Sequence, residues 1–303
     1  MQIGAIFPQT EIGPDPAAIR DYVEAVEGME FDYLFIADHV LGADPDHHEH
    51  VRGSYYTHHS VIHESLTTLA FIAALTTRIR LITGILILPQ RQTALVAKQA
   101  AEIDVLSGGR LTLGIGVGWN HVEFEALGED FTNRGIRSEE QIDLMRALWT
   151  NEVVNFDGRW HSVRSAGIKP LPVQRPIPVW FGAGGSAGPV PRDVVLRRIA
   201  RMGDGWFPSF GPDDTARGVL DKMQTYIAEA GREPSDVGLA GRIRMPDKSP
   251  DEWLAEVEGW QSLGGTHVMA EARRGPLSSV DQHIEAMRQF REVVPVGWGR
   301  GVD

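Results

Sequence analysis

Residues 80–119 constrain the fold more than any other part of the chain, because their pattern requires two buried parallel strands joined by a helix. Residues 81–89 are almost continuously apolar, which is typical of a strand covered by helices on both faces. Residues 93–106 carry apolar side chains at helical spacing and end before a glycine pair, as a helix with a left-handed cap does. Residues 111–119 form a second apolar run with alternating glycines. Parallel strands need such a crossover, so this stretch predicts one strand–helix–strand unit.

The same alternation continues along the rest of the chain. Strands are expected at residues 3–7, 32–37, 81–89, 111–119, 179–181, 206–209, 237–245 and 266–269. Helices are expected at 16–29, 64–75, 93–106, 139–149, 192–202, 215–231 and 280–293, with one more around 253–260. Asp157-Gly158 is a strong two-residue turn signal, so residues 153–163 are expected to form a β-hairpin inserted before strand five. Eight strands alternating with eight helices predict a (β/α)8 TIM barrel, as a single domain over residues 1–303.

Composition narrows the range of partners. A formal net charge of -12 and a pI near 5.4 argue against binding to nucleic acid backbones or anionic lipid, so a small-molecule substrate is expected. The absence of cysteine excludes disulfides, thiolate nucleophiles and cysteine-ligated zinc. The chain shows no secretory signal pattern and no apolar run long enough to cross a bilayer, so we expect a cytoplasmic protein. The helix expected at 64–75 is apolar nearly all round, which favours a subunit interface and a homodimer.

Chemistry is expected where barrel strands end, because the loops at the C-terminal strand ends build the site. Asp38 and His39 follow the second strand, and histidine is the side chain that gives or takes a proton near neutral pH. A histidine that only hydrogen-bonds at the strand end is the alternative. Gly84 interrupts an apolar strand, which favours a bulge or a close ligand approach over a simple need for a small residue. Gly116, Gly118 and Trp119 are expected either to line a pocket or to fill the core.

Five short motifs, in this order and at about these separations, resemble luciferase-like oxidoreductases, most closely the branch that uses the deazaflavin coenzyme F420. The motifs are FIADHV at 35–40, TGILILP at 83–89, LSGGR at 106–110, GIGVGW at 114–119 and GDGW at 203–206. The resemblance runs from the first residue to about the seventh strand. It implies a (β/α)8 barrel, often dimeric, that binds reduced flavin or deazaflavin.

The resemblance also implies roles for individual residues. A non-proline cis peptide bond near Gly84-Ile85 backs the cofactor ring in relatives, and His39 lies beside that ring as a candidate proton donor. Relatives hold the cofactor phosphate on backbone amides that correspond to Gly184, Gly185 and Ser186, and small residues that lead into a helix N-terminus suit an anion. The implied catalytic residue is His39. The expected cofactor-binding residues are Asp38, His39, Thr83, Gly84, Ile85, Gly116, Gly118, Trp119, Gly184, Gly185 and Ser186.

Two departures from the family pattern stand out. Some deazaflavin dehydrogenases carry a glutamate where this chain has Trp119, so no carboxylate acid is expected at that position. Pro189 and Pro191 come shortly after Ser186 and place the start of the fifth helix, and with it the anion geometry, in question.

Two groups of polar residues have competing interpretations. Residues 46–63 contain six histidines, but their spacing does not prearrange metal ligands, so we expect no metal site and interpret the segment as a solvated, mobile lid. Near the ends of strands seven and eight, Arg242, Arg244, Glu271 and Arg273 are candidates to meet an anionic substrate or the coenzyme's tail. Ordinary exposed charge is the alternative for each of these four.

The leading hypothesis is an oxidoreductase that transfers a hydride between F420 and a small organic substrate at the C-terminal mouth of the barrel. The first alternative is an FMN-dependent monooxygenase of the same family. The second is a non-catalytic flavin- or deazaflavin-binding barrel, which the absence of a carboxylate acid after the fourth strand supports. A metal hydrolase built on the histidine-rich loop is a third alternative.

Overall fold

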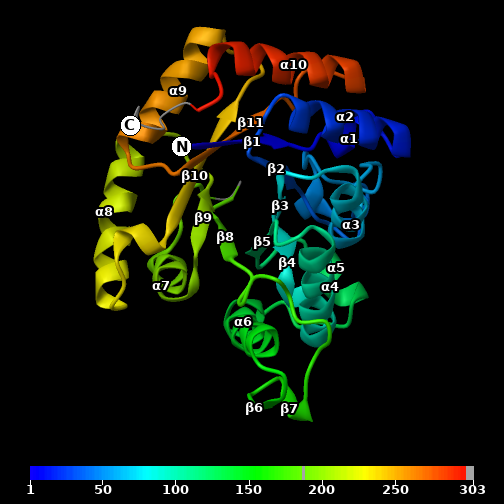
Figure 1. The fold of residues 1–303 in the computed structure, drawn as a ribbon, viewed down its shortest axis with the longest axis vertical. Helices are drawn as coiled ribbons and strands as arrows, with labels where there is room; N and C mark the ends of the chain where they lie inside the picture. The colour runs from blue at the N-terminus through cyan, green and yellow to red at the C-terminus, as the bar shows by residue number, and fades with distance from the viewer. Residues whose placement is uncertain (186–187, 298–303) are drawn as a thin grey trace.

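The computed structural model describes residues 1–185 and 188–297 and shows a closed parallel β-barrel surrounded by helices (Figure 1). Neighbouring strands pair in the order β3-β2-β1-β11-β10-β9-β8-β5-β4, and additional pairing of β3 with β5 closes the sheet. β3 and β4 are two parts of one strand, so the described residues form the expected eight barrel strands. Their bounds are β1 Gln2–Ile6, β2 Tyr33–Ile36, β3 Arg80–Thr83, β4 Leu86–Ile87, β5 Leu111–Gly116, β8 Val179–Ala183, β9 Gly205–Pro208, β10 Gly238–Arg244 and β11 His267–Glu271.

Helices cover the outside of the barrel, as the alternating pattern predicts (Figure 1). The longer ones are α2 Pro16–Gly28, α3 Ser65–Leu75, α4 Thr93–Leu106, α6 Arg134–Thr150, α7 Asp193–Met202, α8 Asp214–Glu229, α9 Pro250–Ser262 and α10 Val280–Val293. The inserted hairpin is confirmed: β6 Val154–Asp157 pairs antiparallel with β7 Ser162–Ala166 and extends from the barrel beyond α6.

Three helical segments differ from the sequence-based expectation. α6 begins at Arg134 rather than at residue 139, and short helices form at α1 Gln9–Ile12 and α5 His121–Ala126. α5 lies in a polar stretch for which the sequence pattern predicts no helix. Its first turn is capped by the side chain of Asn120, which accepts a hydrogen bond of 3.3 Å from the Val122 amide. Six residues are too few to show helical periodicity, which is why the pattern missed this helix.

Two apolar cores hold the barrel together. The larger one lies between the sheet and the helices. The smaller one fills the barrel interior with Ile6, Tyr33, Phe35, Ile82, Trp180, Phe207, Ala240 and Met269. Because side chains alternate along a strand, the residue two positions beyond an interior residue also faces inward. Arg242 follows Ala240 in β10 and Glu271 follows Met269 in β11, so both side chains face the C-terminal mouth above the interior core.

Among the described residues, no helix is long and apolar enough to cross a membrane. α3, which we expected to be apolar on more than one face, buries Leu66, Leu69 and Ile72 and leaves Phe71 42% exposed. The neighbouring α4 leaves Leu95 and Leu106 exposed. Three large apolar side chains are therefore exposed on two neighbouring helices.

Candidate functional site

The third barrel strand is interrupted at Gly84, as predicted, and the Gly84–Ile85 peptide bond is cis. β3 ends at Thr83 and β4 resumes at Leu86. A Cβ atom at Gly84 would lie 1.9 Å from Cε1 of Phe35 inside the barrel, so only glycine fits at this position. Gly84 thus packs directly on the interior core.

Ile85 forms the upper surface of that core. A Cβ atom at Gly116 would lie 2.4 Å from its Cδ1 atom, and a Cβ at Gly182 would lie 2.8 Å from its Cγ2 atom. The glycines of β5 and β8 therefore make room for Ile85. For Gly116 the sequence left pocket lining and core filling open, and this contact with Ile85 is a packing contact. Ile85 remains partly exposed above the core and provides an apolar shelf at the barrel mouth.

His39 is paired with a carboxylate that the sequence analysis did not identify. Its Nδ1 lies 3.0 Å from Oε2 of Glu123, whose side chain is fully buried at the start of α5. Oε1 of Glu123 accepts hydrogen bonds from the amides of Val40 at 2.8 Å and Leu41 at 3.1 Å. Burial alone would raise the pKa of Glu123, but the hydrogen bonds from His39 and these amides outweigh it and lower the pKa below its ordinary value.

This pairing fixes how His39 can act. Because the Glu123 carboxylate is ionised and can only accept, Nδ1 of His39 donates, and Nε2 is the atom free to take or release a proton. Nε2 makes no hydrogen bond within the described part of the chain, and 9% of the residue is exposed. Position 119 itself holds a tryptophan and no carboxylate. Glu123, four residues further on, supplies a carboxylate behind the histidine instead.

Aromatic side chains surround His39. The ring centroid of Tyr56 lies 4.6 Å from that of His39, and the ring of Trp119 lies 5.8 Å away in an edge-on orientation. The Tyr56 hydroxyl accepts a hydrogen bond of 3.3 Å from Arg273. The loop of residues 41–62 thus contributes a ring directly to the site and is more than a solvated lid. Trp119 stays 42% exposed, which favours pocket lining over core filling.

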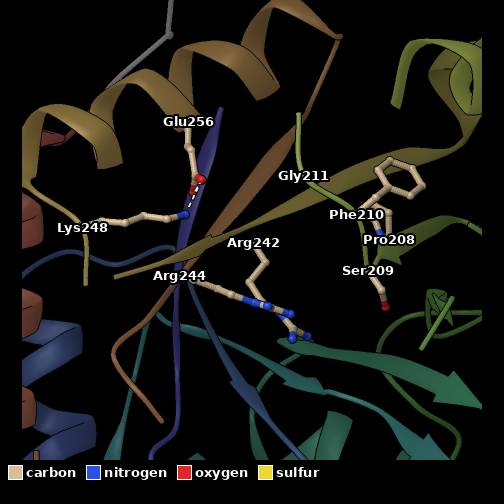
Figure 2. Close-up of a pocket in the computed structure, with 8 residues that line it drawn as sticks. All are labelled: Pro208, Ser209, Phe210, Gly211, Arg242, Arg244, Lys248 and Glu256. Atoms are coloured by element: carbon tan, nitrogen blue, oxygen red, sulfur yellow. Dashed lines mark hydrogen bonds and ion pairs between the residues drawn. The ribbon is translucent and has the colours of Figure 1, made fainter. Parts of the chain in front are cut away.

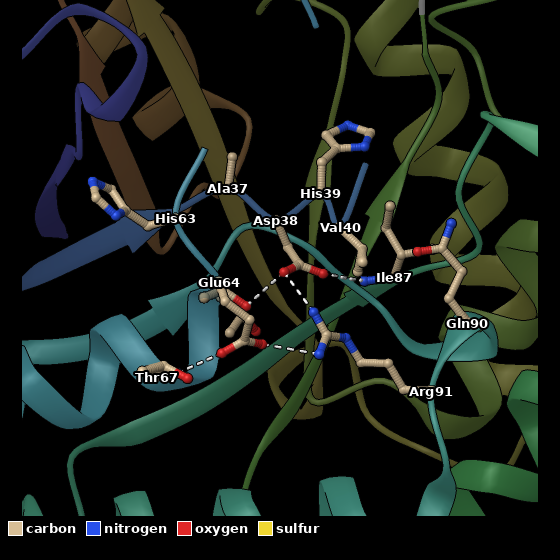
Figure 3. Close-up of polar contacts among 12 residues, drawn as sticks. Ala37, Asp38, His39, Val40, His63, Glu64, Thr67, Ile87, Gln90 and Arg91 are labelled. Carbon is tan, nitrogen blue, oxygen red and sulfur yellow. Dashed lines mark hydrogen bonds and ion pairs between the residues drawn. The ribbon is translucent and has the colours of Figure 1, made fainter. Parts of the chain in front are cut away.

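Asp38 points away from His39 (Figure 3). Its side chain accepts hydrogen bonds from Arg91 at 2.8 Å, from Ser65 at 3.0 Å and from the Ile87 amide at 3.2 Å. Asp38 therefore fixes the end of β2 against the strand that follows the cis peptide bond. A cofactor contact by Asp38 stays a prediction, and its side chain is already occupied by these three bonds.

Two other candidates also have internal partners. The Thr83 hydroxyl donates a 2.7 Å hydrogen bond to the Gly114 carbonyl, which ties β3 to β5. Gly118 adopts a left-handed conformation with φ of 72°, and a Cβ there would lie 2.6 Å from Cγ2 of Ile87. Both contacts account for these residues structurally, and their contact with a cofactor stays a prediction.

The phosphate-binding segment is only partly described, because Ser186 lies outside the described residues. Gly184 has a left-handed φ of 85°, and the Gly185 amide donates to the Gly188 carbonyl at 3.0 Å. α7 begins only at Asp193, so the glycines do not run directly into its first turn. Anion binding by Gly184, Gly185 and Ser186 stays a prediction.

The mouth has two sides, which we name for their side chains. The histidine side consists of His39, Ile85, Gly116, Trp119 and Glu123. The arginine side consists of Ser209, Arg242, Arg244, Glu271 and Arg273. On the arginine side, Arg273 donates a 2.7 Å hydrogen bond to the buried Glu271 carboxylate. Tyr56 touches both sides, because it contacts His39 and accepts from Arg273.

No group of three or more histidine, aspartate or glutamate side chains within residues 1–185 and 188–297 could hold a metal ion. In the histidine-rich loop, His47 contacts Asp44 at 2.8 Å and His50 contacts Asn120 at 3.2 Å. These contacts give the loop internal polar partners.

Comparisons with known proteins give consistent results. A family model described as luciferase-like monooxygenase matches residues 2–292. An uncharacterised protein of Mycobacterium tuberculosis is 36% identical over 169 residues, which are 56% of each chain, so the match spans little more than half of that relative. An F420-dependent glucose-6-phosphate dehydrogenase of Intrasporangium calvum is 28% identical over 310 residues, covering 93% of this chain and 87% of that one.

Two further matches are an FMNH2-dependent monooxygenase, found by sequence, and a solved monooxygenase structure, found by fold. An FMNH2-dependent dimethylsulfone monooxygenase of Pseudomonas putida is 33% identical over 172 residues, covering 56% of this chain and 46% of that one. The crystal structure of a monooxygenase from Streptomyces bottropensis superposes with a TM-score of 0.77 over 97% of this chain and 98% of that one, at 19% identity. That structural likeness confirms the barrel fold.

Proposed function

The chain belongs to the luciferase-like monooxygenase family, and from this premise we propose that it is an oxidoreductase that binds coenzyme F420 on the histidine side of the mouth. In this proposal it transfers a hydride between the coenzyme and a small organic substrate. The F420-dependent dehydrogenase relative, which aligns over 93% of the chain, supports the choice of coenzyme.

The observation that carries the proposal is the His39–Glu123 pair. A buried, ionised carboxylate orients the imidazole and leaves Nε2 as its one reactive atom. A carboxylate behind a histidine fixes the ring's tautomer and stabilises the imidazolium form. His39 can therefore hold a proton at Nε2 and deliver it to, or take it from, a group bound in the mouth.

The mouth also fits a flat, partly apolar ring. Ile85 presents an apolar surface over the interior core, and Trp119 is exposed beside His39. When bound, F420 supplies the hydride donor or acceptor. The chain's own residues would bind and orient such a ring: Ile85 would support one face, His39 would hold a proton at Nε2 beside it, and Tyr56 and Trp119 would exclude water.

An FMN-dependent monooxygenase is the second candidate function. The FMNH2-dependent relative supports it, although that match covers only 56% of the chain. The histidine side suits either ring. The non-catalytic alternative is weakened, because the His39–Glu123 pair can exchange a proton without a carboxylate acid after the fourth strand.

Titration of the purified protein with the two cofactors tests the proposal. We expect saturable quenching of F420 fluorescence at micromolar concentration and no comparable response to FMN. We also expect loss of F420 absorbance when an alcohol or aldehyde of a broad screen gives a hydride to oxidised F420, or return of that absorbance when an unsaturated carbonyl compound takes a hydride from reduced F420. Preferential FMN binding with oxygen-dependent turnover would replace the F420 proposal with the second candidate. Binding without turnover of any compound would favour the non-catalytic alternative.

We further propose that the protein is a homodimer formed through the apolar surface of α3 and α4. Phe71, Leu95 and Leu106 are 42%, 52% and 58% exposed on these two helices. A large exposed apolar surface often marks a protein interface. Light scattering during gel filtration tests this proposal, and a monomer at all concentrations would contradict it.

A further inference from the structure

The arginine side of the mouth borders a small, positively charged pocket (Figure 2). The pocket has a volume of about 190 Å³ and is lined by Pro208, Ser209, Phe210, Gly211, Arg242, Arg244, Lys248 and Glu256. Figure 2 shows the guanidinium groups of Arg242 and Arg244 side by side, because the two residues lie two positions apart on the inward face of β10. The Ser209 side chain extends from the end of β9 toward the same space.

Charges at this pocket are not balanced. Lys248 is paired with Glu256, and Arg273 is paired with Glu271. Arg242 and Arg244 share the same Glu271 carboxylate, at 3.7 Å and 4.0 Å, which is too long for a hydrogen bond. Three guanidinium groups thus face one carboxylate in a chain whose net charge is -12. This pocket is therefore locally positive although the chain as a whole is negatively charged.

Donors at the pocket also lack acceptors. Neither Arg242 nor Arg244 donates a side-chain hydrogen bond to any described residue. Nε of Arg242 is buried without a partner, whereas the Arg244 side chain is 58% exposed beside it. A buried donor without an acceptor is costly, and the guanidinium fork matches the two oxygens of a carboxylate or phosphate. Sites that enclose a whole drug-sized ligand occupy roughly 300–1,000 Å³. This pocket is smaller, so it suits one functional group of a larger molecule.

We propose that Arg242 and Arg244, together with the Ser209 hydroxyl, bind an oxyanion group, a carboxylate or a phosphate, carried by a molecule bound in the mouth. The inference deepens the proposed function and rests on it for the molecule that carries the group, which is either the substrate or the cofactor's side chain. Gly184 adjoins this pocket, since a Cβ there would lie 3.1 Å from Cβ of Ser209. The pocket thus adjoins the glycine segment that was expected to bind the cofactor phosphate.

Direct binding of inorganic phosphate tests the site without any need for activity. Phosphate is titrated into the protein at low ionic strength, and its binding is measured by calorimetry. The natural protein is compared with a double variant that carries both Arg242→Gln and Arg244→Gln. Arg20→Gln is the matched control, because Arg20 is an exposed arginine on α2. We expect about tenfold or more loss of phosphate affinity in the double variant and no change in the control. Unchanged phosphate affinity in a folded double variant would overturn the proposal.

If the double variant does not fold, Arg244→Lys provides the same test, because it keeps the charge and removes the planar fork. We then expect a weaker but still measurable phosphate interaction. Affinity equal to that of the natural protein would count against the site.

Paired ligands distinguish the two sources of the oxyanion. The double variant is titrated with FMN and riboflavin, and with F420 and its chromophore without the phosphate-bearing side chain. Weaker binding of only the phosphate-bearing member supports the cofactor as the source. Unchanged cofactor binding, with phosphate still bound by the cofactor-loaded natural protein, supports the substrate. If no cofactor binds the natural protein, the proposed function fails, while the phosphate titration still decides the anion site.

Discussion

The two sides of the barrel mouth differ in how completely their polar groups are paired. On the histidine side, both oxygens of Glu123 accept hydrogen bonds, Nδ1 of His39 is paired with Glu123, and Nε2 of His39 has no partner among the described residues. On the arginine side, three guanidinium groups face one carboxylate, and Nε of Arg242 is buried without an acceptor. A paired side is preorganised before any ligand arrives, whereas an unpaired side is completed by the ligand.

This difference separates two tasks at the barrel mouth. The histidine side can position a proton and support a ring without rearranging, and the arginine side can select for charge. Tyr56 links them, because it packs on His39 and accepts a hydrogen bond from Arg273. Substitutions on the histidine side are therefore expected to affect turnover, and substitutions on the arginine side are expected to affect affinity.

The largest effect is expected for His39→Gln. Loss of a positioned acid or base reduces turnover by about 10²- to 10⁴-fold, whereas cofactor affinity is expected to change little because the Ile85 shelf remains. Steady-state kinetics and a fluorescence titration measure the two quantities separately. Equal turnover in the variant and the natural protein would show that His39 has no proton-transfer role.

Glu123→Gln is expected to lower turnover less, because it keeps the shape but removes the charge behind His39. The variant also weakens the acceptor for the Val40 and Leu41 amides, so we expect about 1–3 kcal/mol of lost stability at neutral pH. The pKa of Glu123 is lowered in the folded protein, so its contribution is complete above the ordinary value of 4.5 and is lost as pH falls through the folded value. Urea unfolding at several pH values should show the stability gap shrinking below pH 4.5. If the stability difference between the natural protein and the variant grew as the pH was lowered, the lowered pKa of Glu123 would be contradicted.

Gly116→Ala tests whether Ile85 is a fixed shelf. The added Cβ would lie 2.4 Å from Cδ1 of Ile85 and would displace it, at a cost of about 1–3 kcal/mol in stability and with weaker cofactor binding. Gly218→Ala in α8 is the matched control, because no atom lies within 4 Å of its added Cβ and alanine favours helix. Thermal unfolding of both variants provides the comparison. If Gly116→Ala melted at the same temperature as Gly218→Ala, Ile85 would be free to move and would not be a fixed shelf.

The smallest effect is expected for Lys248→Gln. Lys248 lines the same pocket as Arg242 but is paired with Glu256, so its removal should change phosphate affinity by less than about fivefold. Calorimetric titration with phosphate measures this effect beside the double arginine variant. A loss as large as that of the double variant would mean that total charge, and not the unpaired arginines, determines binding.

Most of the fold could be predicted from sequence because its signals are local. The break at Gly84 is visible as a glycine within an apolar strand, and the hairpin as an Asp157-Gly158 turn. The position of His39 at a strand end follows from the barrel pattern. Each of these features depends on residues that are close together in the chain.

The missed parts of the site depend on distant contacts. Glu123 meets His39 across 84 positions in the chain, and only the capping residue Asn120 indicates that a helix starts there. Tyr56 lies in an irregular loop that gives no periodic signal, and its contact with Arg273 spans 217 positions. For Gly116 the sequence left pocket lining and core filling open, because no local pattern indicates that Ile85 occupies the space beside it.

A crystal structure with the bound cofactor tests the division of the mouth most directly. The account predicts that the ring lies against Ile85 with an edge near Nε2 of His39, and that any oxyanion in the complex contacts Arg242 and Arg244. A ring bound on the arginine side, or one bound outside the mouth with His39 untouched, would contradict it.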